Sequence, residues 1–146
     1  MTIADHNTDM LHRNDPEDQA AVRQSLGQIW AAAAARDFET LESFHLYGPN
    51  FTSFKNGAPR EDAAANAAGE RAMFSVLEGP EVDMRQLAVN FFGDVGIATF
   101  NGHFTGMMNG YPAELRQQAT MVFVSAGDGW KLVHEHFSPL AMSQPD

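Results

Sequence analysis

The spacing of apolar residues changes character near residue 80 of the chain. Before this point apolar side chains recur every three to four positions, which predicts helices. After it, apolar and polar residues alternate, which predicts strands. Helices followed by antiparallel strands are typical of a segregated α+β domain. We therefore expect a single domain over residues 15–142, preceded by a polar, disordered tail over residues 1–14.

Three helices are expected in the first half of the chain. Asp15–Pro16 begins the first, because an aspartate N-cap followed by proline is a strong helix start. Asp37 caps a second, shorter helix. A third, alanine-rich helix is expected from Arg60 to about Leu77, with Gly79–Pro80 as its end.

Five strands are expected, separated by turn sequences. A short one over residues 51–54 precedes the third helix and carries two aromatic residues on one face. The four long strands are expected at roughly 82–91, 94–105, 112–125 and 129–138. Gly93–Asp94, Asn109–Gly110 and Gly127–Gly129 lie between them and favour hairpins.

Composition narrows the classes of function. The 146 residues contain no cysteine, which excludes disulfides, thiolate metal sites and cysteine catalysis. Nineteen acidic residues against nine basic ones give a net charge of −10, which argues against binding to nucleic acid or to an anionic membrane. The sequence has no run of about 18 apolar residues that could span a bilayer. We expect a soluble, cytoplasmic protein.

The last predicted strand has the sequence WKLVHEHFS, residues 130–138. With the order of elements, this ending resembles the SnoaL-like, ketosteroid-isomerase-like members of the nuclear transport factor 2-like superfamily, over about residues 17–140. The resemblance implies a cone-shaped, cystatin-like α+β barrel, with three helices packed in a curved, mainly antiparallel sheet. It also implies a pocket between helices and sheet, and a homodimer joined through the outer sheet face. Such proteins include isomerases, dehydratases, polyketide cyclases and members without known activity, so the fold leaves the function open.

Two departures from this pattern bear on the reaction. Ketosteroid isomerases use an aspartate base on an early strand, whereas residues 44–47 and 51–54 contain no carboxylate. Relatives with this ending often have an arginine two residues before the threonine, where this chain has Gln118, with Arg116 nearby. These departures argue against steroid isomerase activity.

The last strand supplies the first two candidate catalytic residues. Strict alternation places His134 and His136 on the face of Trp130, as a pocket floor. An imidazole can move a proton because its pKa lies near neutrality. The alternative is that both are core histidines with hydrogen-bonded neighbours. Glu135 would face the other way, as a surface or interface ion-pair residue, and the HEH run on a strand is no helical metal motif.

Other candidates come from several strands. His45 is the third predicted catalytic residue, at the junction between the second helix and the first strand. The predicted ligand-binding residues are Tyr47, Phe54, Asn101, His103, Arg116 and Gln118. A purely structural role stays open for these residues. Arg116, for example, would be a solvated or interface residue if it lies on a convex face. No metal site and no cofactor are expected.

Two functions are compatible with these residues. The first is a small-molecule pocket protein, acting as an isomerase, dehydratase or cyclase by histidine acid–base chemistry on an apolar or aromatic substrate. The second is a non-catalytic module of unknown function for ligand binding or dimerisation. The sequence does not decide between them.

Overall fold

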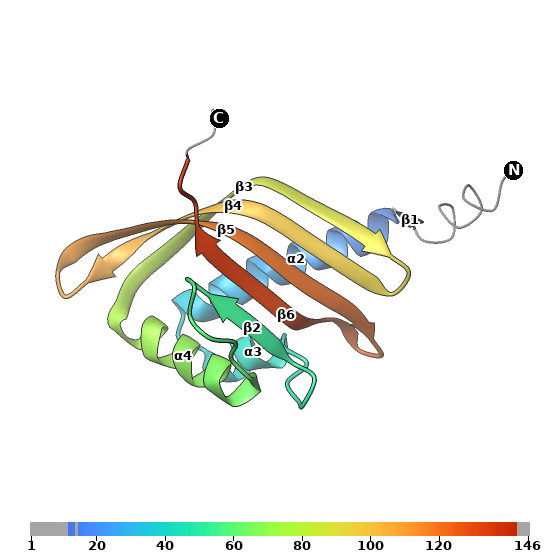
Figure 1. Cartoon of the computed structure of the whole chain (residues 1–146), viewed down its shortest axis with the longest axis horizontal. Helices are drawn as coiled ribbons and strands as arrows, with labels where there is room; N and C mark the ends of the chain where they lie inside the picture. The colour runs from blue at the N-terminus through green and yellow to red at the C-terminus, as the bar shows by residue number, and fades with distance from the viewer. Residues whose placement is uncertain (1–11, 14, 143–146) are drawn as a thin grey trace, which may run out of the picture.

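The computed structural model describes residues 12–13 and 15–142. One curved, six-stranded sheet arches over the helices, in the order β1-β3-β4-β5-β6-β2 (Figure 1). The strands are β1 (His12–Arg13), β2 (Thr52–Lys55), β3 (Leu77–Phe92), β4 (Val95–Met108), β5 (Tyr111–Ala126) and β6 (Gly129–Pro139). The helices are α2 (Pro16–Ala34), α3 (Phe38–Ser43) and α4 (Ala63–Val76). β2 is parallel to β6, and the other pairings are antiparallel. The predicted α+β class, with three helices packed against a curved, mainly antiparallel sheet, is confirmed.

Each helix begins at an aspartate whose side chain accepts a backbone hydrogen bond. Asp15 and Asp37 cap α2 and α3, as the sequence predicts. Asp62 caps α4, so this helix begins at Ala63, three residues later than expected. Such caps satisfy backbone N–H groups that have no partner within the helix. None of the helices in the described part of the chain has the length and apolarity needed to cross a membrane.

The connection from α4 to β3 differs from the prediction. α4 ends at Val76 and β3 begins at the next residue, so Gly79 and Pro80 lie within the strand. The register of β3 against β4 shifts between Glu78 and Glu81, and Gly79 adopts a φ of 55°, which glycine tolerates without strain. A glycine–proline pair therefore marks an irregularity within a strand here, rather than the end of a helix.

The predicted tail falls mostly outside the described residues, which leave out residues 1–11 and 14. His12 and Arg13 are described, and they pair with Phe92 and Phe91 as β1. These two positions thus extend the edge of the sheet, although the sequence assigns them to a tail.

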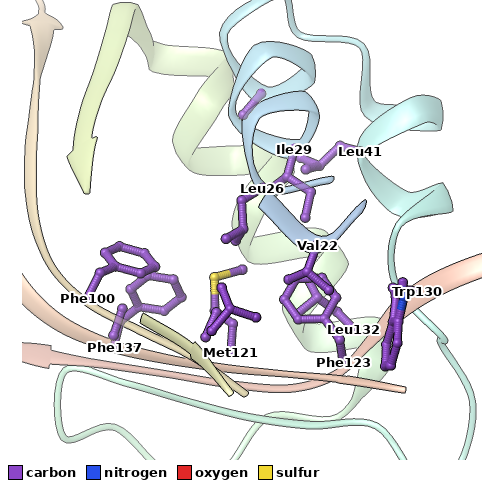
Figure 2. Packing of buried hydrophobic residues seen from close by; sticks show 14 of the residues in the cluster. Val22, Leu26, Ile29, Leu41, Phe100, Met121, Phe123, Trp130, Leu132 and Phe137 are labelled. Carbon is purple, nitrogen blue, oxygen red and sulfur yellow. The ribbon is translucent and has the colours of Figure 1, made fainter. Parts of the chain in front are cut away.

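The core lies between α2 and the inner face of the sheet. In Figure 2 the side chains of Val22, Leu26 and Ile29 point from the helix toward those of the strands. The labelled strand residues opposite them are Phe100, Met121, Phe123, Leu132 and Phe137. Burial of such apolar surface stabilises a fold by roughly 25 cal/mol per Å². The recurrence of apolar residues every three to four positions, which predicts helices, thus gives α2 one buried face.

β6 contains a bulge that changes which residues face the core. Its pairing with β5 shifts register between Leu132 and His134, so Val133 has no partner in the ladder. Leu132 is fully buried, and beyond the bulge Glu135 is only 2% exposed while His136 is exposed. The prediction that His134 and His136 share the face of Trp130, which is buried with Leu132, is therefore wrong. The prediction of Glu135 as a surface residue is wrong for the same reason.

Candidate functional site

A cavity of about 340 Å³ lies between α2, α4 and the inner face of the sheet. This volume falls in the range of small-molecule sites. Most of its wall is apolar, from residues that include Ile29, Trp30, Met73, Phe74, Phe104 and Phe137. Its polar lining residues include Lys55, Asn56, Glu70, Gln117 and Glu135. The cavity thus joins an apolar chamber to a group of polar and charged side chains.

Two buried glutamates and one lysine form the charged part of this lining. Glu135 projects inward from β6, and Glu70 projects from the buried face of α4. Lys55, the last residue of β2, places its Nζ atom 3.6 Å from Oε1 of Glu135 and 3.8 Å from Oε1 of Glu70. The ammonium group therefore lies within ion-pair distance of both carboxyl groups.

His45 adds an imidazole behind the two carboxyl groups. Its Nδ1 lies 2.9 Å from the carbonyl oxygen of Leu41 and donates to it, because a carbonyl can only accept. Nε2 then faces the carboxyl groups, 3.5 Å from Oε1 of Glu70 and 4.0 Å from Oε1 of Glu135. The ring stacks on Tyr47 with 4.6 Å between the ring centroids. One tautomer and one orientation of His45 are thereby fixed.

Asn66 organises the charged groups. Its Oδ1 accepts from Nζ of Lys55 at 2.6 Å and from Oγ of Ser53 at 3.0 Å. Its Nδ2 donates to Oε1 of Glu70 at 3.2 Å and to the hydroxyl of Tyr47 at 2.9 Å. Asn66 is fully buried, so this network holds Lys55 and Glu70 in place without competition from water.

Three buried polar atoms at this point have no hydrogen-bond partner among the described residues. They are Nε2 of His45, Oε2 of Glu70 and Oε1 of Glu135. Buried polar atoms in proteins are almost always paired, because an unpaired one costs about 1–3 kcal/mol. Three such atoms lie in one cluster, two of them on residues that line the cavity, and this makes the cluster the candidate functional site.

The surroundings of the two carboxyl groups shift their pKa values in opposite directions. Burial raises the pKa of Glu135 to about 7, and the nearby Glu70 raises it further against the opposing effects of Lys55 and His45. Burial also acts to raise the pKa of Glu70, but the ion pair with His45 outweighs it, so this pKa is lowered. For His45, burial acts to lower the pKa, yet the two glutamates raise it overall. The two carboxyl groups thus differ: beside His45, Glu70 favours its charged form, while the pKa of Glu135 lies near neutrality.

The same three residues have the donor types of a metal site. The ligand atoms of His45, Glu70 and Glu135 all lie within 4.8 Å of one another. However, the Lys55 ammonium lies within 3.8 Å of both carboxyl groups and already supplies positive charge there. A divalent cation would bind only after Lys55 moved away, so the arrangement favours proton chemistry over metal binding.

The structure brings two of the predicted residues to this site. His45 belongs to the cluster, and Tyr47 stacks on it. The other seven lie on the outer face of the sheet, away from the cavity lining: Phe54, Asn101, His103, Arg116, Gln118, His134 and His136. His134 bonds to Oγ1 of Thr52 at 2.8 Å there. The functional roles predicted for these seven stay predictions.

Sequence reasoning missed four residues of the site: Lys55, Asn66, Glu70 and Glu135. A signal existed for Asn66 and Glu70, which stand four residues apart and so on one face of an otherwise alanine-rich helix. Glu135 gave no such signal, because the bulge before it reverses the expected alternation.

Comparison with known proteins agrees with this architecture. A family model described as a SnoaL-like domain matches residues 22–142. A candidate dehydratase of the nuclear transport factor 2-like family from Streptomyces avermitilis is 21% identical, with a TM-score of 0.79 over 88% of this chain and 100% of that one. A nuclear transport factor 2-like protein from Salmonella enterica is 16% identical, with a TM-score of 0.77 over 88% and 94%. A candidate calcium/calmodulin-dependent kinase II association domain from Exiguobacterium sibiricum is 12% identical, with a TM-score of 0.73 over 90% and 99%. No curated protein matches the chain in sequence.

Proposed function

The chain belongs to the SnoaL-like domain family, and from this we propose that it is an enzyme that moves a proton on a small molecule held in its cavity. The proposal rests on Glu135. Its Oε1 atom is buried beside Lys55 at an apolar cavity, with no hydrogen-bond partner in the described structure. A carboxyl group with a pKa of about 7 both accepts and donates a proton at neutral pH.

The proposed reaction begins at a carbon next to a carbonyl group. The Glu135 carboxylate removes a proton from this carbon, so the C–H bond breaks and its electron pair moves toward the carbonyl oxygen. Lys55 is placed to stabilise the negative charge on that oxygen. Glu135, now neutral, returns the proton to another carbon in an isomerisation, or to a departing hydroxyl group, which leaves as water, in a dehydration.

His45 and Glu70 act in this proposal as positioning residues. Their ion pair places a positive and a negative charge behind Glu135, at 3.5 Å from one another. Lys55 with ionised Glu135 forms the second pair, so the reactive state of the site has no net charge. The Streptomyces avermitilis protein, described as a candidate dehydratase, supports the same class of reaction.

The test measures exchange of the α-protons of 2-tetralone, a neutral bicyclic ketone, in D2O by NMR. We expect the wild-type protein to accelerate exchange, with a rate that rises with pH and levels off above about 7, since the carboxylate is the reactive form. E135Q should lower the rate by about 100-fold or more. H134Q and H136Q, which change the neighbouring residues on the outer face, should stay within about twofold.

Two outcomes would contradict the proposal. One is an E135Q protein that is folded by circular dichroism and still exchanges at the wild-type rate. The other is loss of exchange in H134Q or H136Q alone, which would restore the histidine mechanism predicted from the sequence.

A second function, self-association, is favoured by apolar side chains on the outer sheet face. Ile97 and Val122 are half-buried there, and Phe54 is 37% exposed. We propose that a second copy of the chain covers this face in a homodimer; the Exiguobacterium sibiricum protein is described as a candidate association domain. The mass in solution should equal two chains, and a monomer at tens of micromolar protein would contradict the proposal.

A further inference from the structure

Acidic residues dominate the charges around the cavity. Five glutamates contribute to its described lining, and Lys55 is the single lysine or arginine there. Lys55 is already engaged, because Nζ donates to Asn66 and faces both Glu70 and Glu135. While Glu135 is ionised, before it takes a proton from the substrate, the described lining therefore offers no uncommitted basic group to an incoming anion.

Three glutamates of this lining, Glu61, Glu81 and Glu114, lie outside the acid–base cluster. Glu81 and Glu114 are exposed, whereas Glu61 is half-buried. Two backbone hydrogen bonds with Ser53, of 3.0 and 2.9 Å, fix it beside β2. Its carboxylate turns toward α4, because Oε2 would lie 3.7 Å from a Cβ atom placed on Gly69, which also lines the cavity. No lysine, arginine or histidine among the described residues lies within ion-pair distance of it. Its negative charge is therefore uncompensated at the cavity wall.

We propose that the cavity takes uncharged carbonyl compounds and excludes carboxylates and phosphates, and that Glu61 is a specificity-determining residue for this exclusion. This inference rests on the proposed function, because it names the substrate class of the same site. A neutral substrate leaves the two internal ion pairs undisturbed. An anionic one would bring a further negative charge, in a poorly solvated space, toward Glu61 and Glu70 without a free cation to meet it.

The experiment compares two probes of the same size, 2-acetonaphthone and 2-naphthoate, which differ in a methyl ketone against a carboxylate. Their affinities for the full chain are measured by isothermal titration calorimetry at pH 8. We expect the ketone to bind at least tenfold more tightly than the carboxylate. E61Q should raise the affinity for 2-naphthoate about threefold or more, and leave that for 2-acetonaphthone within about twofold.

Two further variants sharpen the result. E39Q removes the same charge from an exposed position on α3, outside the cavity lining, and should change neither affinity. E135Q should also favour 2-naphthoate, because it leaves Lys55 with one acidic partner fewer.

Several results would overturn the inference. These are equal affinity of the wild-type protein for both probes, no binding of the ketone, or equal gains from E61Q and E39Q. Failure here and failure of the proposed function are distinguishable. Tight binding of 2-naphthoate, with exchange of 2-tetralone still dependent on Glu135, would refute only the substrate class. Selection of the ketone without any exchange would refute only the reaction.

Discussion

The two faces of strand β6 carry ionisable residues that are adjacent in the sequence but differ in burial. On the inner face Glu135 is buried beside Lys55, and burial raises its pKa to about 7. On the outer face His136 is exposed, and His134 bonds to Thr52 within reach of solvent. The comparison indicates that burial can give a carboxyl group a pKa near neutrality, which among side chains only histidine ordinarily has.

Ion pairs at exposed positions show the same dependence on surroundings when their distances are compared. His103 lies 2.7 Å and Arg116 lies 3.3 Å from Oε1 of Glu114, closer than Lys55 lies to Glu135. Glu114 is 58% exposed at its side chain, so water screens these contacts. Such surface pairs contribute at most about 1 kcal/mol. The longer contacts inside have the larger consequences because little water reaches them.

The largest expected difference between the two faces is in stability, when one basic residue is replaced on each face. K55M leaves Glu70 and Glu135 buried with His45 as their only nearby cation in the described structure. Breaking a buried pair in this way typically costs about 3–5 kcal/mol, and partial exposure of Lys55 places the expected loss at about 3 kcal/mol. Unfolding in urea, monitored by circular dichroism, measures the change.

R116M is the matched control on the outer face, where the expected loss stays below about 1 kcal/mol. Adding E135Q to K55M should recover part of the lost stability, because the carboxylate left without its cation is then gone. Equal losses in K55M and R116M would contradict the distinction between the two faces.

Most of the fold could be predicted from the sequence, because it depends on local signals. The caps at Asp15 and Asp37 and the period of the first helix specify those elements before any tertiary contact forms. The connection at Gly79–Pro80 was misplaced since a glycine–proline pair suits a strand bulge as well as a helix end. The pair by itself does not distinguish the two.

Little of the candidate site could be predicted, because it is assembled by tertiary contacts. The sequence suggests His45, which lies in the cluster, but its partner Glu70 comes from a helix 25 positions away in the chain. Glu135 was assigned to the wrong face because Val133 inserts one residue into the ladder. A bulge leaves no reliable mark in a single sequence, and it inverts every assignment of faces beyond it.

A smaller difference between the faces is expected in the pH dependence of stability. The pKa of Glu135 is about 7 in the folded protein and near 4.5 when unfolded, so its contribution to stability is full below pH 4.5 and is lost as the pH rises through 7. E135Q does not lose stability in this way, because glutamine has no proton to release. Its Tm should equal that of the wild type at pH 4.5 and exceed it by about 5 °C at pH 8.

Differential scanning calorimetry across this range checks the sign of the effect. Glu70, whose pKa is lowered, contributes stability that is present above its unfolded pKa, so it adds little pH dependence between pH 5 and 8 in either protein. H136Q serves as the outer-face control and should show no such pH-dependent gain. A Tm difference between E135Q and wild type that stays constant with pH would contradict burial as the cause of the raised pKa.

The smallest expected effect concerns the two outer histidines. Burial lowers the pKa of His134, a hydrogen bond with Thr52 opposes this, and the charge of His136 lowers it further. H136Q should therefore raise the pKa of His134, measured by NMR titration of its ring protons. E135Q should leave it unchanged, although Glu135 is the adjacent residue in the chain, because its carboxyl group lies on the other side of the sheet. If E135Q moved this pKa as far as H136Q does, the two faces would share one electrostatic environment, and the separation of buried site from outer surface would not hold.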